Sequence, residues 1–192
     1  MKINFPLLAL AVGAFAIGTT EFSPMGFLPE IARDLEISIP RAGMLISAYA
    51  LGVMLGAPLM TLWLSRYSKR KSLILLMAIF TIGNTLATLA PNYLGLMGAR
   101  IITSLNHGAF FGIGSVVAAS VVPKDKQASA VAMMFMGLTI ANIGGVPLAT
   151  WIGQHIGWRM AFLGISLLGL LTMFSLWKAL PEGQSSQKPD VR

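Results

Sequence analysis

Two charged residues lie inside stretches that are otherwise apolar, and their types allow proton chemistry. Glu21 is the one charged residue between positions 5 and 28, and Arg100 lies in a second apolar stretch, 93–121. Ionisable groups at membrane depth are costly and usually mark the path of an ion, a proton or a substrate. A carboxyl group holds its proton more tightly in a low dielectric, and a nearby guanidinium weakens that hold. An approaching substrate or a moving arginine could therefore control proton binding at Glu21.

Counting along two antiparallel helices places Glu21 and Arg100 at similar depths. Glu21 precedes Leu28 by seven residues and Arg100 follows Tyr93 by seven, so each is expected about 10 Å from the same membrane face. We expect the two side chains to meet. The alternatives are a static ion pair and a Glu21 side chain that reaches the membrane interface.

Four other polar residues in apolar stretches are candidates for a substrate cavity. His107 lies two helical turns from Arg100 on the same face, and Asn106 is beside it. A hydrogen bond between helices is the alternative role for His107. Tyr49 and Asn142 are further candidates for the same cavity.

The composition excludes several other kinds of protein. There is no cysteine, and His107 and His155 lack a carboxylate pattern around them, so we expect no metal, no cofactor and no enzymatic activity. With 192 residues, 55% hydrophobic and 11% charged, the chain has too little polar surface for a soluble globule. The net charge of +7 comes from short clusters between apolar stretches, which predicts contact with membrane lipid and not with nucleic acid.

Residues 1–180 are predicted to form an all-α membrane bundle of six transmembrane helices. A bilayer requires each apolar stretch to be helical. The predicted spans are 5–28, 42–64, 72–90, 93–121, 128–152 and 160–180. The first is too long for the core of a signal peptide. Residues 181–192 are polar and without periodicity, which predicts a cytoplasmic tail or the start of a linker.

The basic residues between spans predict the topology. They lie after the second and fourth spans, at Arg66, Lys69, Arg70, Lys71, Lys124 and Lys126. Because cytoplasmic loops are enriched in lysine and arginine, these loops and both termini are expected on the cytoplasmic side.

Small residues and one polar face predict how the spans pack. Pairs such as Gly52 with Gly56 and Gly108 with Gly112 are spaced by four residues, which lets helices approach closely. Thr81, Asn84 and Thr85 share one face of the third span. That face is either a helix contact or the edge of a cavity, and we expect a contact.

Four sequence motifs together resemble those of a known transporter family. They are Gly18-Thr19-Thr20-Glu21-Phe22 with Pro24 to Pro29, Ser47-Ala48-Tyr49-Ala50-Leu51-Gly52, Asn106-His107-Gly108-Ala109-Phe110-Phe111, and Gly157-Trp158-Arg159. With six spans, they resemble the amino-terminal half of a major facilitator superfamily transporter, in the branch of proton-coupled drug and sugar efflux transporters that includes arabinose-efflux permeases.

The resemblance implies a function and a set of roles. The fold would be the three-plus-three inverted repeat of the superfamily, and the function would be exchange of a small molecule for protons by alternating access in a bacterial inner membrane. Glu21 and Arg100, which matches the family's intramembrane arginine, would couple proton and substrate. Arg66, Lys69 and Arg70 would belong to the cytoplasmic gating loop, and Gly144, Gly145 and Pro147 to an antiporter-like motif in the fifth span.

The sequence departs from the family pattern in both motifs. In the cytoplasmic loop, Ser65 replaces the usual aspartate and Ser68 the second glycine, so the basic residues could serve only as topology determinants. In the fifth span, Val146 separates Gly145 from Pro147 and Ala149 stands where another glycine is usual.

Six spans form only one wall of the cavity that two halves of the superfamily fold enclose. Two copies could assemble, a separate chain could supply the second six-span half, or the chain could be a truncated fragment that only packs against other helices. A passive channel of several copies is a third functional class. It would show flux without dependence on a pH gradient.

Overall fold

The computed structural model describes residues 4–182, and within this range the chain is helical with no β-strand. The helices are α1 (Phe5–Gly26), α2 (Leu28–Asp34), α3 (Ile39–Leu64), α4 (Lys69–Leu89), α5 (Tyr93–Ser104), α6 (His107–Ser120), the 3-10 turn η1 (Lys124–Lys126), α7 (Gln127–Ile140), the π-helix η2 (Ala141–Gly145), α8 (Val146–Ile152), the π-helix η3 (Gly153–Gly157) and α9 (Trp158–Ala179).

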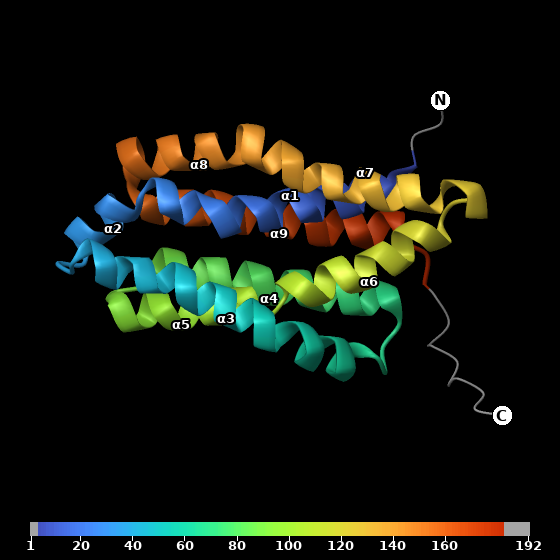
Figure 1. Cartoon of the computed structure of the whole chain (residues 1–192), viewed down its shortest axis with the longest axis horizontal. Helices are drawn as coiled ribbons and strands as arrows, with labels where there is room; N and C mark the ends of the chain where they lie inside the picture. The colour runs from blue at the N-terminus through green and yellow to red at the C-terminus, as the bar shows by residue number, and fades with distance from the viewer. Residues whose placement is uncertain (1–3, 183–192) are drawn as a thin grey trace.

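The helices run back and forth along the long axis of the molecule (Figure 1). In the described residues, five helical stretches, counted across short irregular turns, are long and apolar enough to cross a membrane, and the last, Lys124–Ala179, has 56 residues. At 1.5 Å per residue this stretch would extend about 80 Å, more than twice the hydrocarbon core of a bilayer. Gly157, with a φ of 131° that favours glycine, reverses the chain between α8 and α9. The stretch therefore supplies two spans.

Polar side chains just before the helices fix where several spans begin. Asn4, Ser38, Ser68 and Asn92 each accept a hydrogen bond from a backbone N–H in the first turn of the helix that follows. Such caps satisfy N–H groups that the helix itself leaves unpaired. The spans thus begin close to the predicted positions.

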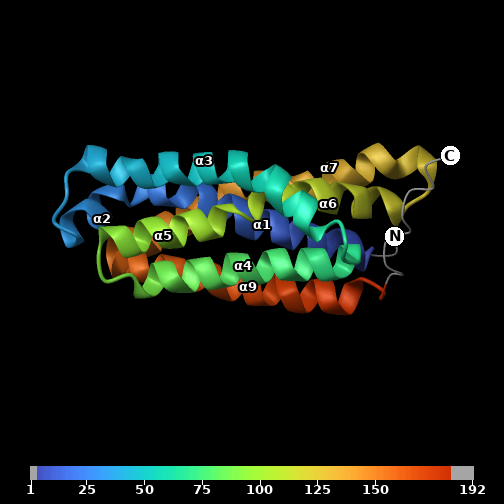
Figure 2. The ribbon, with the colours of Figure 1, turned by 90° about the horizontal axis from the view of Figure 1, so that it is seen from below.

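The contacts between helices repeat in the way that two related groups of three spans require. The first span (α1) packs on the fifth (α7 and α8), and the fourth span (α5 and α6) packs on the second (α3) in the matching way. The first span also packs on the sixth (α9), which matches the packing of the fourth span on the third (α4). The third and sixth spans, α4 and α9, lie side by side (Figure 2). The six-span fold and its three-plus-three arrangement are confirmed.

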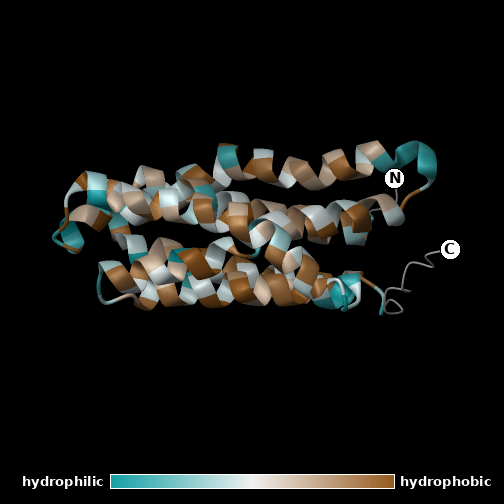
Figure 3. Cartoon of the chain, turned by 60° about the horizontal axis from the view of Figure 1, so that its bottom comes forward, coloured by the Kyte–Doolittle hydropathy of each residue, from teal (hydrophilic) through white to brown (hydrophobic). Residues whose placement is uncertain are grey.

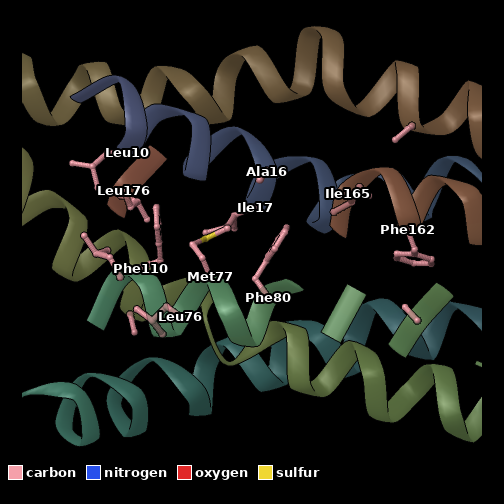
Figure 4. Close-up of a cluster of buried hydrophobic side chains, with 14 of the residues drawn as sticks. Leu10, Ala16, Ile17, Leu76, Met77, Phe80, Phe110, Phe162, Ile165 and Leu176 are labelled. Atoms are coloured by element: carbon pink, nitrogen blue, oxygen red, sulfur yellow. The ribbon is translucent and has the colours of Figure 1, made fainter. Parts of the chain in front are cut away.

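The core lies where these two groups of helices meet. Figure 4 shows Leu10 and Ile17 of α1, Met77 and Phe80 of α4 and Phe110 of α6 directed into this space, and all five are buried. Apolar residues elsewhere remain on the outside, especially along α3 and α9. An outer apolar surface is expected where lipid is the solvent.

The polar face of the third span makes contacts between helices, as predicted. Asn84 accepts a hydrogen bond from the Thr20 hydroxyl on α1 at 2.7 Å. The hydroxyls of Thr85 and Ser166, on α4 and α9, are 2.7 Å apart.

Both predicted cytoplasmic loops lie at the same end of the bundle. The α3–α4 turn and the α6–α7 turn are found where α1 begins and α9 ends (Figure 1), and hydrophilic residues gather at the ends of the bundle (Figure 3). The predicted tail, 181–192, lies outside the described residues except for Pro181 and Glu182.

Gly137 permits the closest approach between α1 and α7, which provides a test of the packing. A Cβ atom at Gly137 would lie 2.0 Å from the carbonyl oxygen of Ala11, a backbone atom that cannot move aside. We expect Gly137→Ala to lower the free energy of unfolding in detergent by about 1–3 kcal/mol. Gly164→Ala is the matched control, because nothing lies within 4 Å of that position. Equal stability of both variants would contradict this packing.

Candidate functional site

Arg100 lies fully buried inside the bundle, with 1% of its surface exposed. Its Nη1 donates a hydrogen bond to the Thr20 hydroxyl at 3.2 Å. The guanidinium carbon lies 4.2 Å from the centre of the Tyr49 ring and 5.7 Å from that of Phe162. Two aromatic faces and a hydroxyl thus surround the cation, an arrangement that stabilises charge through the ring quadrupoles.

The hydrogen bonds around Arg100 connect three spans. The Thr20 hydroxyl of α1 accepts from Arg100 of α5 and donates to Asn84 of α4. Asn84 Nδ2 in turn donates to the carbonyl oxygen of Phe80 in its own helix, at 2.9 Å. Because Thr20, Asn84 and Arg100 are all buried, this network fixes the position of the guanidinium.

Glu21 and His107 face each other beside this network. Glu21 Oε2 and His107 Nε2 are 3.8 Å apart, and 27% of the Glu21 side chain is exposed. The other ring nitrogen of His107, Nδ1, lies 3.2 Å from the Tyr49 hydroxyl. Tyr49 therefore connects the two parts of the site, since its ring contacts Arg100 and its hydroxyl contacts His107.

The structure brings four of the six predicted proton and cavity residues together: Glu21, Tyr49, Arg100 and His107. Glu21 and Arg100 form no ion pair within 4 Å among the described residues. Tyr49 and His107 connect the guanidinium of Arg100 to the carboxylate of Glu21. The sequence predicts the approach of these two residues, and the structure places His107 next to the carboxylate.

A break in the fourth span positions His107. The predicted continuous helix 93–121 is divided into α5 and α6, and His107 is the first residue of α6. Asn106, at the break, is buried and donates through Nδ2 to the carbonyl oxygen of Thr103 at 2.6 Å. Its amide oxygen has no hydrogen-bond partner within the described part of the chain. Asn106 thus stabilises the break through its bond to Thr103.

The fifth span contains the antiporter-like motif and two π-helices. Gly144 and Gly145 end η2, and Pro147 lies in the first turn of α8. Proline lacks the N–H that continues an α-helix, which accounts for irregular winding directly before it. Gly145 packs against Thr19 of α1, where a Cβ atom would lie 2.3 Å from the hydroxyl oxygen. Asn142 is exposed and donates to Leu138 of its own helix at 2.9 Å.

The predicted gating-loop residues divide between two environments. Arg66 Nε donates to the carbonyl oxygen of Trp63 at 3.1 Å, within the same turn. Arg70 Nη2 donates to the carbonyl oxygen of Trp177 on the neighbouring helix α9 at 2.7 Å, and Arg70 Nη1 is 3.5 Å from Glu182. Lys69 begins α4 and is exposed.

Sequence reasoning missed a polar cluster at the opposite end of the bundle. Asp34, at the end of α2, accepts hydrogen bonds from the Arg159 guanidinium and from the Trp158 indole, the latter at 3.0 Å. Arg159 also donates to the carbonyl oxygen of Ala90 at 3.0 Å. The cluster joins α2, the end of the third span and the start of the sixth. The sequence did contain a signal for this cluster, because Asp34 and Arg159 lie in two loops that are predicted on the same side of the membrane.

The described residues contain no group of three or more histidine and acidic side chains that could hold a metal ion. The site at Glu21 consists of the Glu21 carboxylate, the His107 imidazole, the Tyr49 phenol and the Arg100 guanidinium. These groups can bind a proton and attract a charged or polar ligand.

Comparison with known proteins identifies the family. A sequence profile described as Major Facilitator Superfamily matches residues 10–192. The chain belongs to the major facilitator superfamily. Its sequence is 69% identical, over 192 residues, to the inner membrane transport protein YdhP of Escherichia coli strain K12, covering all of this chain and 49% of that protein.

Two further comparisons extend this relationship. The chloramphenicol resistance protein of Streptomyces lividans is 34% identical over 181 residues, which are 94% of this chain and 46% of that protein. A bacterial homologue of the human lysosomal transporter Spinster, solved in an inward-facing and unoccupied conformation, superposes with a TM-score of 0.80 at 18% identity, covering 97% of this chain and 45% of that one. The chain spans about half the length of the curated relatives it matches.

The Asp34 cluster makes stability depend on pH. The hydrogen bond from Arg159, assisted by that from Trp158, holds the pKa of Asp34 below its ordinary value. The stabilisation is thus complete above the ordinary aspartate pKa and is lost as the pH falls through the lowered one. Because the pair is about half exposed, we expect Asp34→Asn to lower the melting temperature at pH 7 by about 2–4 °C at most.

Melting curves across pH test this expectation. The difference between wild type and Asp34→Asn should narrow as the pH falls below the ordinary range of aspartate. Glu30→Gln is the control, since the Glu30–Arg33 pair at 3.4 Å joins two residues of α2 and links no other helix. A difference that is constant with pH would contradict the role of the Asp34 charge.

Proposed function

We propose that this chain forms the amino-terminal half of a proton-coupled efflux transporter of a bacterial inner membrane, which exchanges a small molecule for protons by alternating access. The observation that carries the proposal is the contact of Glu21 with His107, next to the buried Arg100. Transporter names among the relatives support the general class.

The different burial of the two charges supports different roles. Arg100 is enclosed by Thr20 and Tyr49 and has 1% of its surface exposed, so it acts as a fixed positive charge. The Glu21 side chain is 27% exposed and can reach protons and ligands. Glu21 is therefore the group that binds the transported proton, and Arg100 favours the return of its negative charge.

His107 and Tyr49 provide the link between these charges. A neutral imidazole can donate from one ring nitrogen and accept at the other. With Glu21 near Nε2 and the Tyr49 hydroxyl near Nδ1, a change in the charge of Glu21 alters the hydrogen bond to Tyr49, whose ring lies against Arg100. A cationic or polar substrate that binds Glu21 competes with the proton for the same carboxylate.

The proposal includes a second six-span half that completes the cavity. The greater length of the relatives supports this arrangement, as do the exposed apolar side chains on α3 and α8, including Leu51, Leu55, Leu148 and Trp151. The positive-inside rule assigns the end with the α3–α4 and α6–α7 turns to the cytoplasm.

A chimera provides a direct test of proton coupling. Residues 1–192 would replace the matching half of YdhP, and proteoliposomes would be assayed with a panel of small drugs and sugars, chloramphenicol included. We expect flux that depends on a pH gradient. We expect Glu21→Gln to reduce that flux at least tenfold, because glutamine cannot bind and release the transported proton. Size-exclusion chromatography would show that the variant still inserts and folds.

Glu36→Gln is the matched control, because it neutralises an exposed carboxylate outside the spans. It should retain full transport. Full efflux from Glu21→Gln would refute the role of Glu21, and flux that ignores the pH gradient would indicate a passive channel. Absence of all flux in the chimera would favour a fragment that only packs against other helices.

A further inference from the structure

A pocket of about 400 Å³ opens at the basic end of the bundle, between the start of α4 and the end of α9. It is lined on one side by Arg66, Arg70 and Lys71 and on the other by Trp177 and Glu182. The start of α4 and the end of α9 lie at the opposite end of the bundle from α2 (Figure 1).

The charges around this pocket are unbalanced. Among the described residues that line the pocket, Arg66, Arg70 and Lys71 contribute three positive charges and Glu182 the one negative charge. Glu182 is 3.5 Å from Arg70, with 91% of its side chain exposed, so it is held weakly. By contrast the Arg70 side chain is only 13% exposed and is fixed by its hydrogen bond to the Trp177 carbonyl oxygen. A positioned guanidinium with a loosely held carboxylate indicates a site suited to an anionic group.

The surroundings of the pocket match the interface of a membrane. Tyr67 and Trp177 line it, and the rings of Trp63 and Tyr67 lie 6.0 Å apart beside it. Tyrosine and tryptophan favour the headgroup level of a bilayer. Lys178 lies 4.5 Å from the Trp177 ring and adds a further positive charge nearby.

An exposed apolar strip begins where the pocket ends. Phe174 lies next to Trp177, with ring centres 6.1 Å apart, and Leu170, Leu171 and Phe174 are each at least half exposed on α9. Ile74 of α4 lines the pocket itself. A free phosphate ion would contact only the basic residues, whereas a phospholipid would also cover this strip with its acyl chain.

We propose that this pocket binds the phosphate of an anionic phospholipid. Arg66, Arg70 and Lys71 would contact the headgroup, and the exposed apolar strip of Leu170, Leu171 and Phe174 would lie along an acyl chain. Basic pockets between helices on the cytoplasmic side have this recognition chemistry. Glu182 occupies part of the pocket and competes with the lipid. The basic residues of the cytoplasmic loop, whose sequence departs from the family motif, would then bind lipid as well as determine the topology.

Native mass spectrometry of the purified chain with equimolar phosphatidylglycerol and phosphatidylethanolamine tests the proposal. We expect preferential retention of phosphatidylglycerol. The double variant Arg66→Gln/Lys71→Gln should bind it roughly 30-fold more weakly, about fivefold for each charge removed. Both side chains are exposed, so the fold should persist. Glu182→Gln should bind phosphatidylglycerol more tightly, which gives an expected gain as well as an expected loss.

Lys124→Gln/Lys126→Gln is the matched control, because it removes two charges from the other basic turn. It should leave the preference unchanged. Equal retention of the two lipids by wild type, or an equal loss in the control, would overturn the proposal. Displacement of phosphatidylglycerol by millimolar inorganic phosphate would show a free-anion site and would likewise overturn it.

Discussion

The burial of one guanidinium inside an apolar bundle is the constraint on which the rest of this structure depends. An arginine at the centre of a membrane helix costs about 2.5–3.5 kcal/mol on insertion scales. Arg100 is accommodated by the Thr20 hydroxyl and the Tyr49 ring, and no carboxylate of residues 4–182 lies within 4 Å of it. Its charge is thus stabilised without being neutralised, which leaves an attraction for the nearby carboxylate of Glu21.

The helix arrangement follows from this requirement and from close packing at small residues. Thr20 can hydrogen-bond both Arg100 and Asn84 only if the first, third and fourth spans meet along one line. Gly145 brings the fifth span against Thr19, one residue from Thr20. Two irregular backbone positions occur beside this line: the break before His107 and the π-helix before Pro147. They link the local backbone to the proposed site of proton exchange.

The sequence predicted the six spans and the approximate limits of each because length and apolarity are local properties. It also singled out Glu21, His107 and Tyr49, since polar residues stand out in apolar helices. The sequence did not reveal which residues contact Arg100. Helices that are apolar on most sides do not reveal their rotation about the axis, so the sequence could not show that Thr20 faces Arg100 or that His107 faces Glu21. The interruption of the fourth span at Asn106 has no proline to signal it.

The central claim is that Glu21 binds a proton in contact with His107. Infrared difference spectra recorded on a pH change, with the chain in lipid, test it without a second half or a known substrate. We expect a carboxyl C=O band that is absent in Glu21→Gln and shifted in frequency in His107→Asn, because the imidazole is the neighbour of that carboxyl group. A band that persists in Glu21→Gln, or that His107→Asn leaves unmoved, would contradict it.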